Sequence, residues 1–391
     1  MLDTLPPEGR LIVECISLSS KGESRTRAIE QAAIGVDWER LFDDAAGHCV
    51  IPAVYTALAE YIDLIPPSAI KRFRFANAFN TIQQTCLARE LVQVSNDLAA
   101  VGASLIALKG PALAIQAFGR VEARQSGDLD ILVRASDLPE IVKVLAKRGY
   151  CGRGYEKGPL DMGFFGLFED EFVSERGVID LHLELLPSYF PLSRDQELIR
   201  RNAANINFEG GDVTALAPRD QLILSILHAT KHGWGYGALR SMCDIAALTA
   251  NGLVDWEETE DEMARLGYTR ICRLGAVLAH NFAGAAVPEE VLRRSISDRR
   301  VMKLATGIAR NLFPAPPLLR CDWYVPLTAL EGLKRRLRYL LTRTLRPTID
   351  DWEALPLPPS LYWAYYLARP MRLMIHHRPR LFPPRPQLTP Q

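Results

Sequence analysis

The stretch Arg124-Gln-Ser-Gly-Asp128-Leu-Asp130-Ile-Leu-Val133 decides the fold, because it joins two carboxylates to an extended apolar run. Asp128 and Asp130 are separated by one residue, so both side chains point to the same face of the predicted strand. The apolar residues after them fix that strand in a core. Two carboxylates at the start of such a strand repel each other unless a cation lies between them. The stretch therefore predicts a divalent metal site.

A lone Asp-x-Asp is common at turns and solvated strand ends, so the order of the neighbouring elements carries the signal. Upstream, Ser104–Leu108 is predicted to be a short buried strand that ends at the turn Lys109-Gly110-Pro111. Proline suits the first turn of a helix, which we expect over residues 112–118. Downstream, we expect Asp137 to cap an amphipathic helix over Leu138–Arg148.

A third carboxylate follows in the alternating stretch Val178–Leu185, which is predicted to form a hairpin with Phe164–Val173. Asp180, His182 and Glu184 share one face of this strand, and the apolar residues share the other. If this strand neighbours the first, Asp180 lies beside Asp128 and Asp130. Three carboxylates on adjacent strands form a hard oxygen site of the kind that holds Mg²⁺ with substrate phosphates. His182 either orients a neighbouring carboxylate or is an ordinary strand histidine.

The segments on both sides of this α/β stretch have helical periodicity. We therefore expect an α+β fold with a mixed β-sheet core flanked by helices. The predicted parts are an N-terminal helical region (1–100), an α/β core (101–215), a C-terminal helical domain (216–330) and a basic, Pro-rich extension (331–391).

The composition excludes several classes of protein. The 391 residues carry 46 Lys+Arg against 46 Asp+Glu and are 48% hydrophobic, which excludes disorder and bulk electrostatic binding of nucleic acid. The seven cysteines are scattered singly, which argues against a zinc knuckle or a disulfide framework. No apolar run approaches the about 20 residues that cross a bilayer, and no signal peptide is visible. We expect a reduced, cytoplasmic protein without a transmembrane span.

The neutral total hides a division of charge. Residues 331–391 have 11 Lys+Arg against 4 Asp+Glu, a net +7, so residues 1–330 have a net −7. The basic end leaves open a peripheral contact with an anionic partner, such as the inner face of a membrane. Leu361–Ala368 has the aromatic and basic surroundings of an interfacial segment, although a helix packed on the body is the favoured interpretation.

Two spacings in the C-terminal helical domain have simple interpretations. His228 and His232 have the i,i+4 spacing of metal ligands, but no Glu follows the first His and Gly233 ends the helix, so a zinc site is disfavoured. Arg240 and Asp244 have the spacing of an i,i+4 ion pair on a helix.

The order of strand, Lys-Gly turn, helix, Asp-x-Asp strand, helix and third Asp resembles the nucleotidyltransferase superfamily, whose fold is shared with DNA polymerase beta. The chain is most similar to bacterial proteins described as uncharacterised nucleotidyltransferases. The matching stretches are LIALKGPAL (105–113), RQSGDLDILV (124–133), VIDLHLEL (178–185), LHATKHGW (227–234), LRSMCDIAAL (239–248) and LPPSLYWAYYLARPMRL (357–373).

The resemblance implies a nucleotidyltransferase-type sheet, with a helical domain that closes one side of a cleft. Asp128 and Asp130 would bind two metal ions, Mg²⁺ or Mn²⁺, and Asp180 would bind the one at the acceptor. One ion lowers the pKa of an acceptor hydroxyl and the other neutralises the leaving pyrophosphate. The implied reaction moves an NMP from an NTP, with ATP expected, to an unidentified acceptor, which is a small molecule, sugar phosphate, peptide or RNA.

The resemblance also implies contacts with the nucleotide. Phosphates would lie at the helix N-terminus that begins at Gly110, and the cofactor-binding candidates are Lys109, Gly110, Arg124, Gly127, Lys231 and His232. Pro111 departs from the Gly-Gly or Gly-Ser of many superfamily members and removes one N–H donor. This departure motivates a second hypothesis, in which a weakly active or inactive relative binds a nucleotide or a partner as a regulator.

Overall fold

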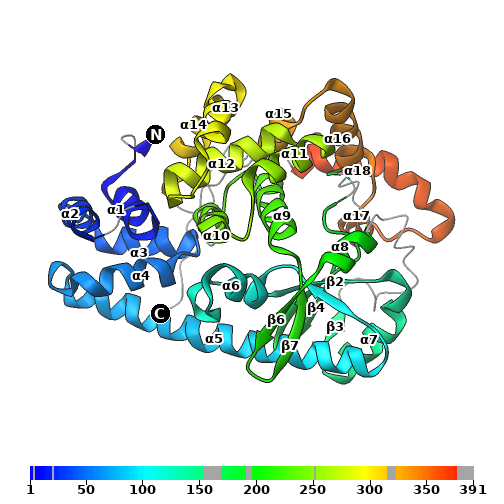
Figure 1. Cartoon of the computed structure of the whole chain (residues 1–391). Helices are drawn as coiled ribbons and strands as arrows, with labels where there is room; N and C mark the ends of the chain where they lie inside the picture. The colour runs from blue at the N-terminus through cyan, green and yellow to red at the C-terminus, as the bar shows by residue number, and fades with distance from the viewer. Residues whose placement is uncertain are drawn as a thin grey trace, which may run out of the picture.

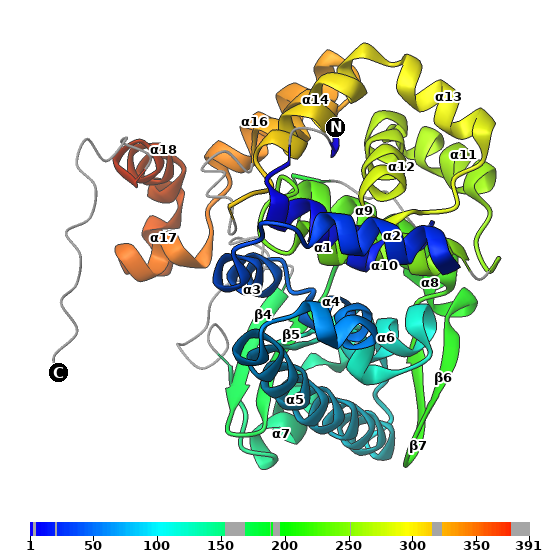
Figure 2. The same cartoon turned by 90° about the vertical axis from the view of Figure 1, so that its left-hand side faces the viewer.

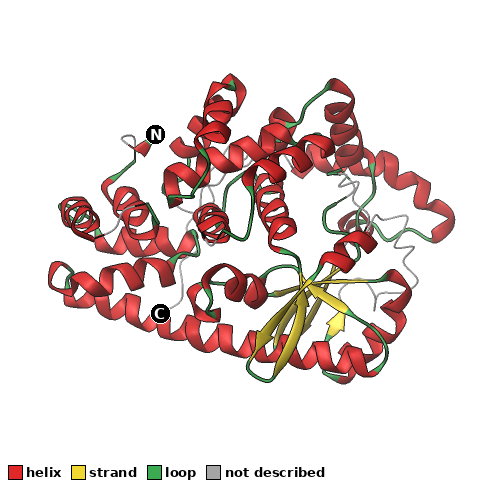
Figure 3. Ribbon diagram, in the orientation of Figure 1, coloured by secondary structure: helices red, strands yellow, loops and turns green. Residues whose placement is uncertain are grey.

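A seven-stranded mixed sheet lies in the lower right part of the view in Figures 1 and 3, with α5 beneath it and other helices above it. The structure is a computed structural model, and it describes residues 1–2, 5–19, 22–152, 169–187, 189–190, 196–250, 252–314 and 323–376. The predicted α+β class is confirmed.

The strand order is β3-β4-β5-β2-β1-β7-β6. β2 pairs in parallel with β5 and antiparallel with β1, and β1 pairs in parallel with β7. The strands are β1 (Leu105–Ala107), β2 (Leu129–Val133), β3 (Cys151–Gly152), β4 (Glu169–Ser174), β5 (Gly177–His182), β6 (Ala204–Phe208) and β7 (Gly211–Ala215).

The hairpin of β4 and β5 forms as the alternation predicts, through the two-residue turn Glu175-Arg176. β5 ends at His182, so Glu184 lies beyond the strand and is exposed, contrary to the expectation that it shares the face of Asp180. The predicted start of the first hairpin strand, residues 164–168, lies outside the described residues.

One face of the sheet packs on two helices that continue the apolar pattern of the strands. α5 (Pro67–Ala100) runs along this face (Figure 1), and Leu91 and Leu98 join a core with Ile131 of β2. α7 (Leu138–Lys147) covers the same core. Asp137 occupies the N-cap position of α7, but its side chain caps no backbone N–H, contrary to the prediction; it accepts from the Ser136 hydroxyl at 2.7 Å instead.

The other face is turned toward a second, larger core, which Leu132 of β2 shares with α6 (Gly110–Phe118) and the helical segments. Helices from both ends of the chain build this core (Figure 2). They are α1 (Pro7–Ile16), α2 (Gly22–Ala32), α3 (Trp38–Gly47), α4 (Ile51–Leu58), α8 (Gln196–Asn202), α9 (Pro218–Lys231), α10 (Ala238–Ala250), α11 (Trp256–Leu266), α12 (Thr269–Ala283), α13 (Glu289–Ser297), α14 (Arg299–Arg310) and α15 (Tyr324–Ala329).

The C-terminal extension begins with α16 (Leu333–Leu345), followed by α17 (Ile349–Ala354) and α18 (Tyr365–His376). Figure 2 shows α17 and α18 at one side of the body. Asp351 is buried and accepts from Arg369 at 2.8 Å and from Arg372 at 2.6 Å, which joins α17 to α18.

In the part of the chain that the structure describes, no helix combines the length and apolarity needed to cross a membrane. The Pro-rich end, residues 381–391, lies outside that part.

One buried histidine makes the helical core sensitive to acid. His48, at the end of α3, is 0% exposed, and its Nε2 lies 2.8 Å from the Leu312 carbonyl oxygen. Nε2 must carry the proton to donate this bond, and within the described residues Nδ1 has no hydrogen-bond partner. Burial, partly offset by the Leu312 hydrogen bond, lowers the pKa of His48 to about 4.

We expect His48 to weaken the fold as the pH falls. The unfolded chain takes up this proton near pH 6.5 and the folded chain resists it, so the stability due to the neutral ring is complete above pH 6.5 and is lost toward pH 4. In urea denaturation, the advantage of wild type over His48→Gln should shrink by about 2 kcal/mol between pH 7.5 and pH 5. An advantage that stays constant with pH would contradict the assignment.

Candidate active site

The turn between β1 and α6 brings the backbone close to the Asp-x-Asp strand. Gly110 has φ +63°, and a Cβ there would lie 3.2 Å from the Asp128 carbonyl oxygen, so a larger residue is both strained and crowded. Pro111 occupies the first turn of α6 as predicted. This close approach places Lys109 and the N-terminus of α6 beside the carboxylates.

The parallel pairing of β2 with β5 sets Asp130 directly opposite Asp180. Both residues point away from the core that contains Ile131 and Leu181, because side chains alternate along each strand. Asp130, Asp180 and His182 offer ligand atoms that all lie within 4.8 Å of one another, an arrangement that fits a metal ion. The predicted juxtaposition of Asp130 with Asp180 is therefore present.

Asp130 is almost fully buried, and two donors hold it in its ionised form. Lys109 Nζ and His182 Nε2 each lie 3.0 Å from Asp130 Oδ1. Burial by itself favours the neutral acid, but the Lys109 charge and the His182 hydrogen bond outweigh it and keep the pKa of Asp130 well below its usual value. Of the two readings of His182 from sequence, the structure shows the one in which it orients a carboxylate.

At the other two carboxylates, the neighbouring cations do not outweigh burial and repulsion. Burial, and then the charge of Asp130, raises the pKa of Asp128. Burial, followed by the charges of Asp130 and Asp128, raises the pKa of Asp180 to about 7. Near neutral pH Asp180 is therefore partly protonated, and a cation bound between the carboxylates would displace that proton.

Glu169 adds a carboxylate that the sequence reasoning missed. The register of the β4–β5 hairpin sets Glu169 opposite His182, and its Oε2 lies 3.6 Å from His182 Nδ1. Its Oε1 lies 4.0 Å from Lys231 Nζ of α9. The two-residue turn at Glu175-Arg176 was the available signal, because it fixes which residues of the two strands face each other.

The carboxylates line a cavity of about 260 Å³ together with cations from other elements. Its volume lies just below the range of about 300–1,000 Å³ that is usual for small-molecule pockets. It is lined by Lys109, Gly110, Arg124, Asp128, Asp130, Glu169, Asp180, His228, Lys231, His232 and Arg240.

Helices α9 and α10 supply the wall opposite the strands. Burial lowers the pKa of Lys231, and burial together with Lys109 and His232 holds the pKa of His228 well below its usual value. The rings of His228 and His232 lie 4.6 Å apart between centroids. Arg240 Nη1 donates to the Gln125 carbonyl oxygen at 3.0 Å, and Arg240 also lines the cavity.

A buried ion pair fastens the Asp-x-Asp loop to α10. Arg124 donates to both oxygens of Asp244, at 2.8 and 3.1 Å, and to the Ser126 hydroxyl at 2.5 Å. Both members of the pair are about 95% buried. The expected i,i+4 pair of Arg240 with Asp244 is therefore wrong: Asp244 is taken by a residue 120 positions away in the chain, whose bidentate geometry is the stronger interaction.

The structure thus brings eight of the nine predicted site residues to one cavity. Gly127 is the exception, since it is exposed and does not line the cavity. Arg124 lines the cavity, but its donors already serve Asp244 and Ser126. Its structural task is to position the loop that carries Asp128.

A sequence model of the family described as "Uncharacterised nucleotidyltransferase" matches residues 35–284. This match covers well over half of the chain, includes every residue that lines the cavity, and shows that the chain belongs to that family. No curated protein matches the chain.

The Arg124–Asp244 pair should matter far more to stability than an exposed pair does. Arg124→Met leaves a buried carboxylate without its partner, and we expect a loss of about 3–5 kcal/mol in the free energy of unfolding, measured with urea. The double variant Arg124→Met/Asp244→Leu should recover most of this loss, because no buried charge then remains uncompensated.

The matched control is Arg134→Met, which removes the exposed pair of Arg134 with Glu197 at 3.3 Å. We expect this change to cost less than about 1 kcal/mol. Equal costs for Arg124→Met and Arg134→Met would show that the buried pair does not hold the loop.

Proposed function

We propose that the protein transfers a nucleoside monophosphate from an NTP, with ATP as the expected donor, to a hydroxyl or phosphate acceptor, using Mg²⁺ or Mn²⁺. The observation that carries the proposal is the register that sets Asp130 against Asp180 in a cavity walled by cations. Membership of the nucleotidyltransferase family supports the reaction class. The acceptor class stays open among small molecules, sugar phosphates, peptides and RNA.

The residues present fit a divalent metal. Asp130 and Asp180 offer carboxylate oxygens from adjacent strands, and burial together with the charges of neighbouring carboxylates raises the pKa of Asp128 and of Asp180, so a bound cation would relieve the repulsion between them. Oxygen ligands of this kind suit Mg²⁺ and Mn²⁺. When bound, such an ion polarises the transferred phosphoryl group and lowers the pKa of the acceptor hydroxyl. His182 would hold Asp130 in orientation rather than compete for the same position, because its Nε2 already bonds that carboxylate.

The rest of the cavity suits a polyphosphate. Lys109, Lys231 and Arg240 place positive charge around the carboxylates, and the N-terminus of α6 adds the positive end of a helix dipole. A volume of about 260 Å³ accommodates the phosphates with metal more readily than a whole nucleotide. Asp180, as the carboxylate beside the acceptor, would accept the proton of the attacking hydroxyl.

We further propose that the protein acts in a reducing compartment such as the cytoplasm. Cys15, Cys49, Cys86, Cys151, Cys243 and Cys272, the cysteines of the described residues, are all free thiols. Free cysteines at this number are characteristic of reducing compartments.

Metal binding should be visible without any turnover. We expect Mn²⁺ or Mg²⁺ to raise the thermal midpoint of the wild type, and Asp180→Asn to abolish this rise. Without metal, Asp180→Asn should melt above wild type at pH 8, because it removes a buried charge that its neighbours repel. That difference should shrink as the pH falls below about 7 and vanish only below about pH 4, where Asp180 is protonated in both the folded and the unfolded chain.

The matched control is Asp212→Asn, a change of the same kind on β7 outside the cavity, which should keep the metal response. A full metal response in Asp180→Asn would remove this residue from the metal site.

Transfer itself is tested by incubating the protein with each α-³²P-labelled NTP, Mg²⁺ and a cell extract, and by separating the labelled products. We expect a labelled product with wild type, and a loss of at least about 100-fold with Asp130→Asn, because the metal ligand is then neutral.

If calorimetry shows Mg²⁺-dependent NTP binding but no extract yields a labelled product or pyrophosphate, the proposed transfer is wrong. The protein is then a nucleotide-binding regulator, the outcome that the missing N–H of Pro111 motivated.

A further inference from the structure

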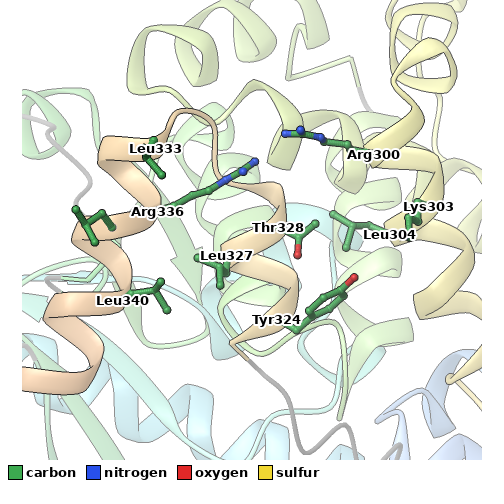
Figure 4. Close-up of a pocket in the computed structure, with 10 residues that line it drawn as sticks. Arg300, Lys303, Leu304, Tyr324, Leu327, Thr328, Leu333, Arg336 and Leu340 are labelled. Atoms are coloured by element: carbon green, nitrogen blue, oxygen red, sulfur yellow. The ribbon is translucent and has the colours of Figure 1, made fainter. Parts of the chain in front are cut away.

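A second hollow lies far along the chain from the carboxylate cavity, between α14, α15 and α16 (Figure 4). Its volume is about 460 Å³, which lies within the usual range for small-molecule sites. Its lining residues fall between Arg300 and Leu340, beyond the segment 35–284 that the family shares. The chemistry common to the family therefore does not account for it.

The walls of this hollow are apolar although they face solvent. Leu333, Leu337 and Leu340 lie on one face of α16 and are 81%, 51% and 36% exposed. Leu304 and Leu327 continue the apolar surface from α14 and α15. Large exposed leucines gathered around one concavity are characteristic of a ligand site rather than of ordinary surface.

The rim of the hollow is cationic. Arg300 and Lys303 of α14 lie on one side and Arg336 of α16 on the other. Figure 4 shows the guanidinium groups of Arg300 and Arg336 extending toward each other across the upper edge. Within the described residues, no carboxylate forms an ion pair with any of the three side chains. Like charges that share one rim without a salt-bridged carboxylate favour an anion at that position.

A backbone hydrogen bond fixes the orientation of Arg336 at this rim. Its Nε donates to the Leu330 carbonyl oxygen at 2.8 Å, which orients the guanidinium and leaves its two terminal nitrogens for another acceptor. Tyr324 and Thr328 also line the hollow, below the two guanidinium groups in the view of Figure 4.

We propose that this hollow binds an amphiphile with one apolar chain and a phosphate head group. The chain lies against the leucines of α16, α14 and α15, and the phosphate lies between Arg300, Lys303 and Arg336. Phosphate suits the three cations because a phosphate monoester carries close to two negative charges and three acceptor oxygens, and a planar guanidinium can bind it in bidentate fashion. The site is independent of the carboxylate cavity, so it stands whether or not the proposed transfer occurs.

The test is calorimetric titration of the full chain with decyl phosphate below its micelle concentration. We expect one binding site. Octyl phosphate, with two fewer methylenes, should bind about tenfold more weakly. Inorganic phosphate and the uncharged decyl glucoside should each bind at least about 100-fold more weakly, because each offers only half of the required chemistry.

Variants locate the site. Leu337→Asp puts a carboxylate on the apolar wall, and the pair Arg300→Ser/Lys303→Ser removes charge from the rim; each should weaken decyl phosphate at least about tenfold. All three residues are exposed, so the fold should tolerate the changes. The matched controls are Leu341→Asp and Arg335→Ser, on the same helix but outside this hollow, which should bind as wild type does.

Three results would overturn the proposal. The first is equal binding of decyl glucoside and decyl phosphate, which indicates detergent adsorption. The second is equal weakening by Leu341→Asp and Leu337→Asp. The third is binding to phosphatidylglycerol vesicles without binding of monomeric decyl phosphate, which indicates a membrane-facing surface instead of a pocket.

Discussion

Repulsion between buried carboxylates is the constraint around which this protein is arranged. The parallel pairing of β2 with β5 sets Asp130 and Asp180 in neighbouring positions, and Asp128 lines the same cavity. Such a cluster is tolerated only if the surrounding elements supply positive charge or protons. Lys109 does so from the adjacent turn, and α9 and α10 bring further cations from the helical part of the chain. The helices on this side therefore bury the face of the sheet and also place positive charge beside its carboxylates.

The part of the site that follows strand periodicity could be predicted from the sequence. Alternation places Asp180 and His182 on one face whatever the rest of the chain does, and a glycine followed by proline after a short apolar run predicts a turn into a helix. Helix bounds such as Trp256–Leu266 also follow, because a capping Asp255 and a terminating Gly267 are local signals that tertiary packing did not override.

Features that depend on long-range pairing could not be predicted in the same way. The i,i+4 spacing predicts a pair of Asp244 with Arg240 because it considers only residues of the same helix. It does not include Arg124, which lies in a distant loop and binds Asp244 through two hydrogen bonds. Glu169 was missed because its position opposite His182 depends on the register of the hairpin, which one residue more or less in the turn would change. The hollow beside α16 likewise exists only once three helices are packed together, although its leucines and arginines are visible in the sequence.

The buried ion pair of Arg124 with Asp244 affects how the carboxylate cavity binds a ligand. Swinging the Asp-x-Asp loop away from α10 would break the two hydrogen bonds between Arg124 and Asp244, both of which are buried. The two walls are therefore already assembled before anything binds, and an incoming molecule does not have to supply the free energy of bringing them together. In this respect the cavity is a preorganised receptor. Selectivity among ligands then comes from the shape and charge of the cavity rather than from closure of the Asp-x-Asp loop onto α10.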